Sequence, residues 1–293
     1  MFRRFFYDKI NIIRRAFYYG KSKKGRIVRI GRALKHQSSL TFSTIICYGT
    51  MRICSKFLNV GRYQIMVETL DSYRQRTAFM WDSLPQNGCL STNDNLRNKV
   101  TEEGSFQPFY GDTVIFSLDD GTDAWLSQIQ DEIYRRCGSI LSDRLDPATF
   151  HITLHDLKNS PYSMPDDVKS NESQAVRLIE RARQKYGNEI YINSRCIFSM
   201  VGTSIVMGFE PETDEDCRIL MSLYEEFQSI VPLSYPLTLH ATIAYYKPGN
   251  YDESVVQILK DTFDVVGRET QRIRLDLDKL NYATFSSMNH YSM

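Results

Sequence analysis

The sequence lacks the patterns that mark several large classes of enzyme and receptor. It contains no Gly-x-Ser-x-Gly elbow and no glycine-rich loop of the kind that cradles nucleotide phosphates. No apolar run reaches the ~18 residues that a membrane-spanning helix needs. The nearest candidate, residues 40–51, is short, rich in Thr and followed by Arg52. The sequence therefore gives no support to an α/β-hydrolase, a P-loop enzyme or a membrane-spanning protein.

Cysteine is sparse and shows no metal-ligand spacing. Six cysteines are scattered through 293 residues without a Cys-x-x-Cys pair: Cys47, Cys54, Cys89, Cys137, Cys196 and Cys217. A disulfide framework is unexpected in a chain this long, so these residues are expected to be reduced and to pack as small hydrophobic side chains. We therefore expect an intracellular, cytoplasmic protein that uses no metal and no cofactor.

Acidic residues are almost absent from the first 62 residues. This segment holds fifteen Lys or Arg and a single acid, Asp8, whereas residues 63–293 carry a net charge of −13, so the overall charge of +1 conceals two opposite halves. Four interpretations of the basic segment stay open: an organelle-targeting peptide, a membrane-surface helix, an arm that contacts nucleic acid, or a poorly ordered tail. The last includes translated sequence upstream of a start at Met51 or Met66.

Three regions follow from composition and periodicity. Residues 1–62 form the basic extension, residues 63–105 a connector with a helix within 68–81, and residues 106–293 the catalytic domain. In the last region, strands are expected at residues 113–118, 150–157, 190–200, 203–209, 238–246 and 273–277. Helices are expected after Gly121, from Asn171 as N-cap, from a capping box at Thr213, and near residues 255–263. The order resembles one strand–helix–strand unit used twice.

Two of these strands carry a His-x-Thr triplet, His151-Ile152-Thr153 and His240-Ala241-Thr242, 89 residues apart. Residues i and i+2 of a strand point to the same face, so each His is expected beside its Thr. Histidine can give or take a proton near neutral pH, and a Thr hydroxyl can donate to a phosphoryl oxygen. Two facing strands would supply a base, an acid and two donors, as phosphodiester cleavage without a metal requires. A single such triplet would more often be an ordinary sheet His and Thr.

The two motifs, in the forms Phe150-His-Ile-Thr-Leu154 and Leu239-His-Ala-Thr-Ile243, resemble the signatures of the two-histidine (2H) phosphoesterase superfamily. This group includes LigT-like RNA 2′,3′-cyclic phosphodiesterases and relatives of 2′-5′ RNA ligases. Residues 104–115 and 280–285 resemble a poorly characterised branch of it. The resemblance covers about residues 104–293, is specific at the motifs and loose between them, and leaves the basic extension outside.

The resemblance implies an α+β fold of two lobes related by a pseudo-twofold axis, in which two antiparallel sheets flank a central cleft and helices lie outside. It implies that His151 and His240 are the acid–base pair, without assigning which is which, and that Thr153 and Thr242 hold the phosphate. The expected activity is hydrolysis of 2′,3′-cyclic, 2′-5′-linked or other small cyclic nucleotide-type phosphodiesters. The alternative is a module of the same fold that binds nucleotides or RNA without catalysis.

Four further residues are candidate substrate contacts. His155 and Tyr246 have the strand parity of His151 and His240, Lys247 follows Tyr246, and Tyr110 lies near a strand end. A metal site built on His151 and His155 is rejected, because residues i and i+4 of a strand lie ~13 Å apart.

Charge bears on the size of the substrate. A net −13 in the catalytic region disfavours long RNA, because RNA binding relies on neutralised phosphates. We therefore expect a nucleotide or short oligonucleotide as substrate and a monomeric protein, with any contact to nucleic acid or membrane made by the basic arm.

Overall fold

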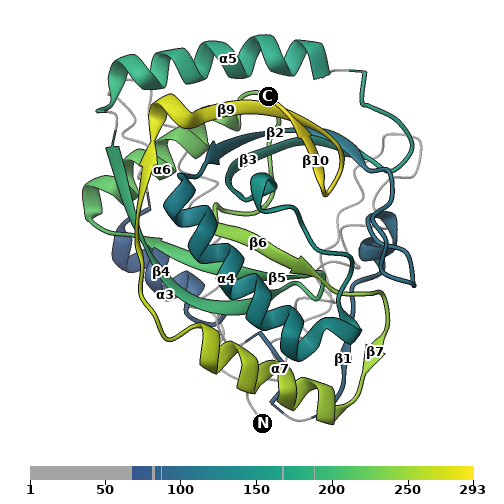
Figure 1. Cartoon of the computed structure of the whole chain (residues 1–293). Helices are drawn as coiled ribbons and strands as arrows, with labels where there is room; N and C mark the ends of the chain where they lie inside the picture. Colours follow the sequence, from purple (N-terminus) through teal and green to yellow (C-terminus); the bar gives the residue numbers. More distant parts are fainter. Residues whose placement is uncertain (1–67, 81–82, 87, 167, 188) are drawn as a thin grey trace, which may run out of the picture. The chain divides into compact units, whose positions relative to one another are not determined.

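The computed structural model describes residues 68–80, 83–86, 88–166, 168–187 and 189–293. The expectations for residues 1–62 lie outside this part of the chain. The described part is a mixed α+β unit whose strands pair antiparallel throughout (Figure 1). None of its helices combines the length and the apolar character needed to cross a bilayer.

The order of elements from residue 110 onward contains the expected strands and helices and adds three strands: the short β7 (Asn250–Tyr251) between β6 and α7, and β9 and β10 at the end. The elements are β2 (Tyr110–Ser117), α4 (Asp120–Cys137), β3 (His151–Ser160), α5 (Val168–Lys185), β4 (Glu189–Met200), β5 (Ser204–Pro211), α6 (Asp214–Phe227), β6 (His240–Tyr245), α7 (Glu253–Val266), β8 (Arg272–Asp276), β9 (Leu280–Ser287) and β10 (His290–Ser292). Short 3-10 turns are η2 (Asp94–Asn98), η3 (Gly138–Ile140), η4 (Pro147–Thr149) and η5 (Leu277–Lys279).

Two four-stranded sheets hold the motif strands, each at an edge. One sheet has the order β10-β9-β2-β3 and the other β6-β5-β4-β8. Helix α4 connects β2 to β3 yet contacts β6 of the other sheet, while α6 connects β5 to β6 yet contacts β3. Figure 1 shows α5 along β9 and β2, and α7 beside α4. One continuous apolar core joins both sheets and the helices, so the two motif strands are held in one folded unit.

Local signals set most helix ends. The capping box at Thr213 is present, with the Thr hydroxyl and the Asp216 carboxylate each bonding the other residue's backbone N–H. The helix expected after Gly121 instead begins at Asp120, because the Asp119 carboxylate caps it. The expectation that Asn171 caps a helix was wrong. Asn171 lies within α5, and its buried side-chain amide donates to Asp112 at 2.9 Å, since a buried carboxylate needs donors.

Residues 68–105, expected as a connector, are part of the core. Helix α3 (Leu70–Thr77) packs against α6 and β5, and β1 (Leu90–Ser91) pairs with β7 (Asn250–Tyr251). The buried apolar side chains of this region join the main core: Leu70, Tyr73, Leu84, Leu90, Leu96 and Val100. The segment therefore completes the folded unit and does not merely lead into it.

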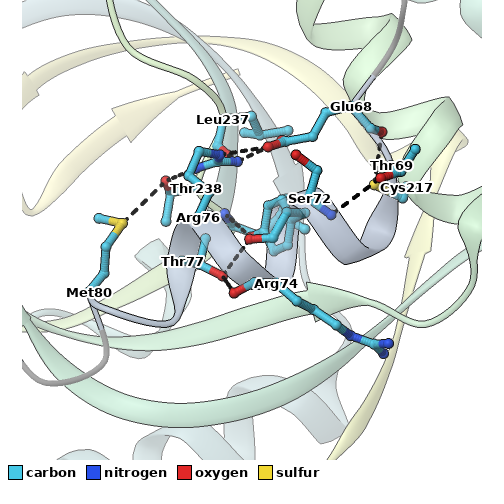
Figure 2. A network of polar contacts seen from close by, with 12 residues as sticks. Glu68, Thr69, Ser72, Arg74, Arg76, Thr77, Met80, Cys217, Leu237 and Thr238 are labelled. Atoms are coloured by element: carbon cyan, nitrogen blue, oxygen red, sulfur yellow. Dashed lines mark hydrogen bonds and ion pairs between the residues drawn. The ribbon is translucent and has the colours of Figure 1, made fainter. Parts of the chain in front are cut away.

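Helix α3 is tied to the chain that leads into β6 (Figure 2). The Arg76 guanidinium donates to the Leu237 carbonyl at 2.7 Å and to the Thr238 hydroxyl at 3.3 Å, while Glu68 accepts from it at 2.8 and 2.9 Å. The buried Tyr73 hydroxyl accepts from the N–H of Leu239 at 3.0 Å and donates to the Phe209 carbonyl. These bonds fix the backbone immediately before His240.

Candidate active site

The two motif histidines are oriented by the same backbone bond. Nδ1 of His151 lies 2.7 Å from the carbonyl oxygen of Thr149, and Nδ1 of His240 lies 2.7 Å from that of Thr238. A carbonyl can only accept, so Nδ1 carries the proton in both rings and Nε2 is left with its lone pair. Neither Nε2 has a hydrogen-bond partner among the described residues. Each ring is thus prepared to take a proton on Nε2, or to donate it once charged.

Burial favours the neutral form of both imidazoles. Burial lowers the pKa of His151 and of His240 from the usual value of 6.5, and the bonds to Thr149 and Thr238 oppose that shift. The charge of His240 lowers the pKa of His151 further. The strands β3 and β6 that carry the two rings are in contact, so both imidazoles belong to one region of the folded unit.

One extra residue follows the Thr of the first motif. Along β2, Ile115 pairs with Thr153 and the adjacent Val114 pairs with His155, which leaves Leu154 as a bulge. Adjacent strand residues point to opposite faces, so Thr153 and His155 do as well. The expectation that His155 shares the face of His151 was therefore wrong.

His155 instead lies in the core. Its side chain is 1% exposed, and its ring centroid is 5.0 Å from that of Tyr224 and 6.1 Å from that of Phe227, both on α6. Neither ring nitrogen has a partner within hydrogen-bond geometry in the described part of the chain. Burial lowers the pKa of His155, and the nearby Asp156 and the Gln228 side chain oppose that shift. A buried ring packed on aromatic side chains cannot contact a substrate.

The second motif contains the same bulge at the same position. Along β5, Val206 pairs with Thr242 and the adjacent Ile205 with Ala244, so Ile243 is the extra residue. The two strands also share a burial pattern over their first five residues, partly exposed at His and Thr and buried at the others. The motifs therefore match in backbone geometry as well as in residue type.

The bulge reverses the faces of the sheet to which Tyr245 and Tyr246 point. Tyr245 pairs with Ser204 and so shares the face of His240 and Thr242, whereas Tyr246 points into the core and is fully buried. The expectation that Tyr246 contacts substrate was wrong for this reason, and Tyr245 takes its place beside the motif. The Tyr245 hydroxyl donates to the Met288 sulfur at 3.2 Å.

On β3, the residue at the corresponding position is Asp156. It pairs with Thr113, two residues from Ile115, and so lies on the face of His151 and Thr153. Its carboxylate accepts from the Tyr235 hydroxyl at 2.9 Å. Its negative charge partly offsets the lowering of the pKa of both motif histidines. The two halves of the site are alike through His and Thr and then differ, with a carboxylate on one side and a phenol on the other.

Two other side chains reach this face from elsewhere in the chain. The ring centroid of Tyr291, on β10, lies 4.8 Å from that of His151. The ammonium of Lys99, which follows η2, lies 5.8 Å from the ring centroid of Tyr245. Sequence reasoning missed Asp156, Tyr245, Tyr291 and Lys99. The one available signal was the apolar spacing of Ile152, Leu154 and Leu157, which breaks strict alternation at the bulge.

The remaining expected contacts lie off this face. Tyr110 starts β2 and pairs with Ser160, at the end of the strand pair away from His151. Lys247 lies beyond the end of β6, with its side chain packed over Gly104. Neither residue is brought to the His and Thr side chains.

The motif strands show neither a metal-binding cluster among the described residues nor a part in the cavity between α7 and β4. No group of three or more His, Cys, Asp or Glu side chains is arranged there to hold a metal ion. A cavity of about 410 Å³ lies between α7 and β4, lined in part by Cys196, Lys260 and Phe263. None of the motif residues lines this cavity.

Comparisons with known proteins leave the family open. No protein-family model and no curated protein matches the sequence. Among solved structures, a conserved protein of unknown function from Agrobacterium tumefaciens (ATU0111) is 15% identical, with a TM-score of 0.49 over 69% of this chain and 91% of that one. TT0787 of Thermus thermophilus is 13% identical, with a TM-score of 0.42 over 62% of this chain and 93% of that one. Both TM-scores are below 0.5, so neither likeness assigns a function.

Proposed function

We propose that this protein is a metal-independent phosphodiesterase in which His151 and His240 act as general base and general acid. The observation that carries the proposal is the duplicated geometry: two edge strands in contact, each with an Nδ1-anchored His, a Thr on the same face and a bulge directly after it. A chance pair of His-x-Thr triplets would not be expected to share all of these features.

The arrangement supplies each part of the reaction. One neutral imidazole takes a proton on Nε2 from water or from a neighbouring hydroxyl, and the freed oxygen attacks phosphorus. The other imidazole, protonated, donates its Nε2 proton to the departing ribose oxygen as the P–O bond breaks. The Thr153 and Thr242 hydroxyls donate to the non-bridging oxygens, where negative charge grows in the transition state. The second proton transfer returns the pair to its starting charge with the roles exchanged.

The same proposal includes a two-lobed, duplicated LigT-like architecture. In support, β2-α4-β3 and β5-α6-β6 are each a strand, a helix and a motif strand, and each connecting helix contacts the other motif strand. Each motif strand pairs with the strand that precedes its helix. A pseudo-twofold axis between β3 and β6 would relate these features.

The substrate we propose is small: a 2′,3′-cyclic phosphate, a short 2′-5′ linkage or a related cyclic nucleotide-type diester. The chain from residue 63 onward carries a net charge of −13, which opposes a long polyanion. Removal of residues 1–60 is therefore expected to leave turnover of a cyclic mononucleotide unchanged. A large loss of turnover would show that the basic segment takes part in binding.

A cleavage assay tests the proposal. Nucleoside 2′,3′-cyclic phosphates and 2′-5′ dinucleotides are incubated in EDTA with the wild-type protein, His151→Ala and His240→Ala. We expect cleavage that resists the chelator and falls at least ~100-fold in each variant. Activity that EDTA abolishes would indicate a metal-dependent hydrolase. Tight binding without turnover over a broad panel of diesters would favour the alternative, a nucleotide-binding module.

A further inference from the structure

The proposed active site binds an anion, and its paired motifs offer only one positive charge, that of the imidazole which is protonated to serve as the acid. A phosphodiester is an anion, and charge on its non-bridging oxygens increases in the transition state. The two Thr side chains are neutral, and burial favours the neutral form of both His rings. The one carboxylate on this face, Asp156, is negative and would repel a phosphate. The charge of the protonated imidazole is lost as this ring gives its proton to the leaving group, so a lasting positive charge has to come from another residue.

Lys99 places an ammonium at the Tyr245 end of the site. Its Nζ lies 5.0 Å from the ring centroid of Phe109 and 5.8 Å from that of Tyr245. Tyr245 shares the face of His240 and Thr242, and the charges of Lys99 and Asp156 interact. The lysine therefore belongs to the same electrostatic environment as the motif residues.

The Lys99 side chain is half-buried, and its ammonium touches no anionic group of the described residues, since Asp156 acts on it only at a distance. Within the described part of the chain it makes no ion pair and no hydrogen bond, and burial lowers its pKa from 10.5. Desolvating a charge without pairing it is destabilising, and a cation–π contact returns only about 0.5–2 kcal/mol. A Met side chain would fill the same space without that penalty. A bound anion at this position would supply the partner that the half-buried Lys99 ammonium lacks.

We propose that Lys99 is an anion-binding residue of this site, whose ammonium pairs with phosphate oxygens of the substrate. The identity of that substrate rests on the proposed function, whereas the binding of a phosphate does not require turnover. Lys99 lies beside Tyr245, and Tyr245 is close to Thr242 on the same face of the sheet. On β5, Thr242 pairs with Val206 and Tyr245 pairs with Ser204, so the two side chains are separated by ~7 Å along the strand. Lys99 thus binds either the phosphate held by the Thr hydroxyls or a second phosphate of the same nucleotide next to it.

Equilibrium binding by calorimetry tests this inference. The ligands are a nucleoside 2′-monophosphate and the corresponding 2′,5′-bisphosphate, and the proteins are wild type, Lys99→Met, Lys99→Gln and Lys99→Arg. We expect the two neutral variants to bind ~10- to 100-fold more weakly, because an ammonium–phosphate bond is lost, and the Arg variant to stay close to wild type. Lys260→Met is the matched control: this lysine is also partly buried, but it lies on α7 and donates to the Gln86 carbonyl.

The two ligands separate the two sources of the phosphate. An equal loss for both ligands places Lys99 at the phosphate held by the motifs, and a loss confined to the bisphosphate places it at a second phosphate. Thermal melting identifies any variant that fails to fold, for which the second neutral variant substitutes. Unchanged binding in folded Lys99→Met or Lys99→Gln, or no phosphate binding by wild type, overturns the inference. Lysine-dependent binding without diester turnover would overturn only the hydrolase proposal.

Discussion

At the residue scale, the site consists of two nearly identical half-sites that diverge beyond the motif. Each half-site presents a His with Nδ1 bound to a carbonyl and a Thr on the same face, both partly exposed. Beyond the bulge, one half-site continues with Asp156 and the other with Tyr245. The His and Thr side chains can therefore act in the same way in both half-sites, while Asp156 and Tyr245 offer different contacts to the two ends of a substrate.

The Thr hydroxyls are expected to act on the transition state. Thr153→Val and Thr242→Val each remove one donor while keeping the shape of the side chain. We expect kcat to fall by roughly 100- to 1,000-fold in each variant, with a smaller effect on KM. Thr→Ser at the same positions restores the hydroxyl and should recover most of kcat. A loss confined to KM would mean that the hydroxyls bind the ground state only.

Buried histidines should make the protein sensitive to acid. Burial lowers the pKa of His155 below the 6.5 of an exposed His, so the unfolded chain binds the extra proton first as the pH falls. Above pH ~6.5, the titration of His155 does not affect stability. Below pH ~6.5, protonation of this His in the unfolded chain lowers the free energy of unfolding. His155→Leu should retain stability at pH 7, since two unpaired ring nitrogens are removed, and should lose less between pH 7 and pH 5.

Urea unfolding at pH 7, 6 and 5 measures this effect, with His290→Leu as a control at an exposed position. Parallel pH dependence in wild type and His155→Leu would contradict the assignment of acid sensitivity to this residue.

At the element scale, α3 acts as a support for the strand that carries His240. The Tyr73 hydroxyl bridges Leu239 to Phe209. Arg76 holds the carbonyl of Leu237, two residues earlier in the chain (Figure 2). The carbonyl that orients His240 belongs to Thr238, between these two anchor points. A helix outside the site thereby sets the direction of a ring within it.

Tyr73→Phe tests this role with the loss of one oxygen atom. We expect unfolding to become easier by about 1–3 kcal/mol, because two buried backbone groups lose their partner. We also expect kcat to fall more than KM rises, because the ring of His240 is less well directed. Tyr162→Phe, at a side chain that is 88% exposed, is the control for removal of a phenol hydroxyl. Lower stability with wild-type kcat would limit α3 to a structural role.

The elements themselves were largely predictable, and the register within them was not. Apolar periodicity and capping residues predicted α4, α6, α7 and the motif strands to within a few residues. Strict alternation along the strands predicted the wrong face for His155 and for Tyr246. The single extra residue in each strand reverses the direction of every side chain that follows it. The α3 anchors and Lys99 were also missed, since long-range contacts leave no periodic signal in one sequence.

At the scale of the whole molecule, the folded unit needs more chain than the resemblance covers. Six apolar residues between Leu70 and Val100 are buried in the common core. At about 1.5–3 kcal/mol each, their burial is comparable to the entire stability of a typical domain. A chain that begins at residue 104 should therefore fail to fold, whereas one that begins at residue 65 should fold.

Circular dichroism and limited proteolysis distinguish the two truncations. A cooperative thermal transition in the shorter chain would show that α3, β1 and η2 are dispensable for the fold.

The pH dependence of kcat/KM in EDTA, measured for wild type and for each His→Ala variant, shows whether the two histidines act as an acid–base pair. Because burial lowers both pKa values, we predict a bell-shaped profile with its maximum at or below pH ~6.5. Each of His151→Ala and His240→Ala should lose one limb of the bell along with most of the rate. A rate that rises steadily with pH, or a bell-shaped profile that persists in both variants, would show that His151 and His240 are not the acid and the base.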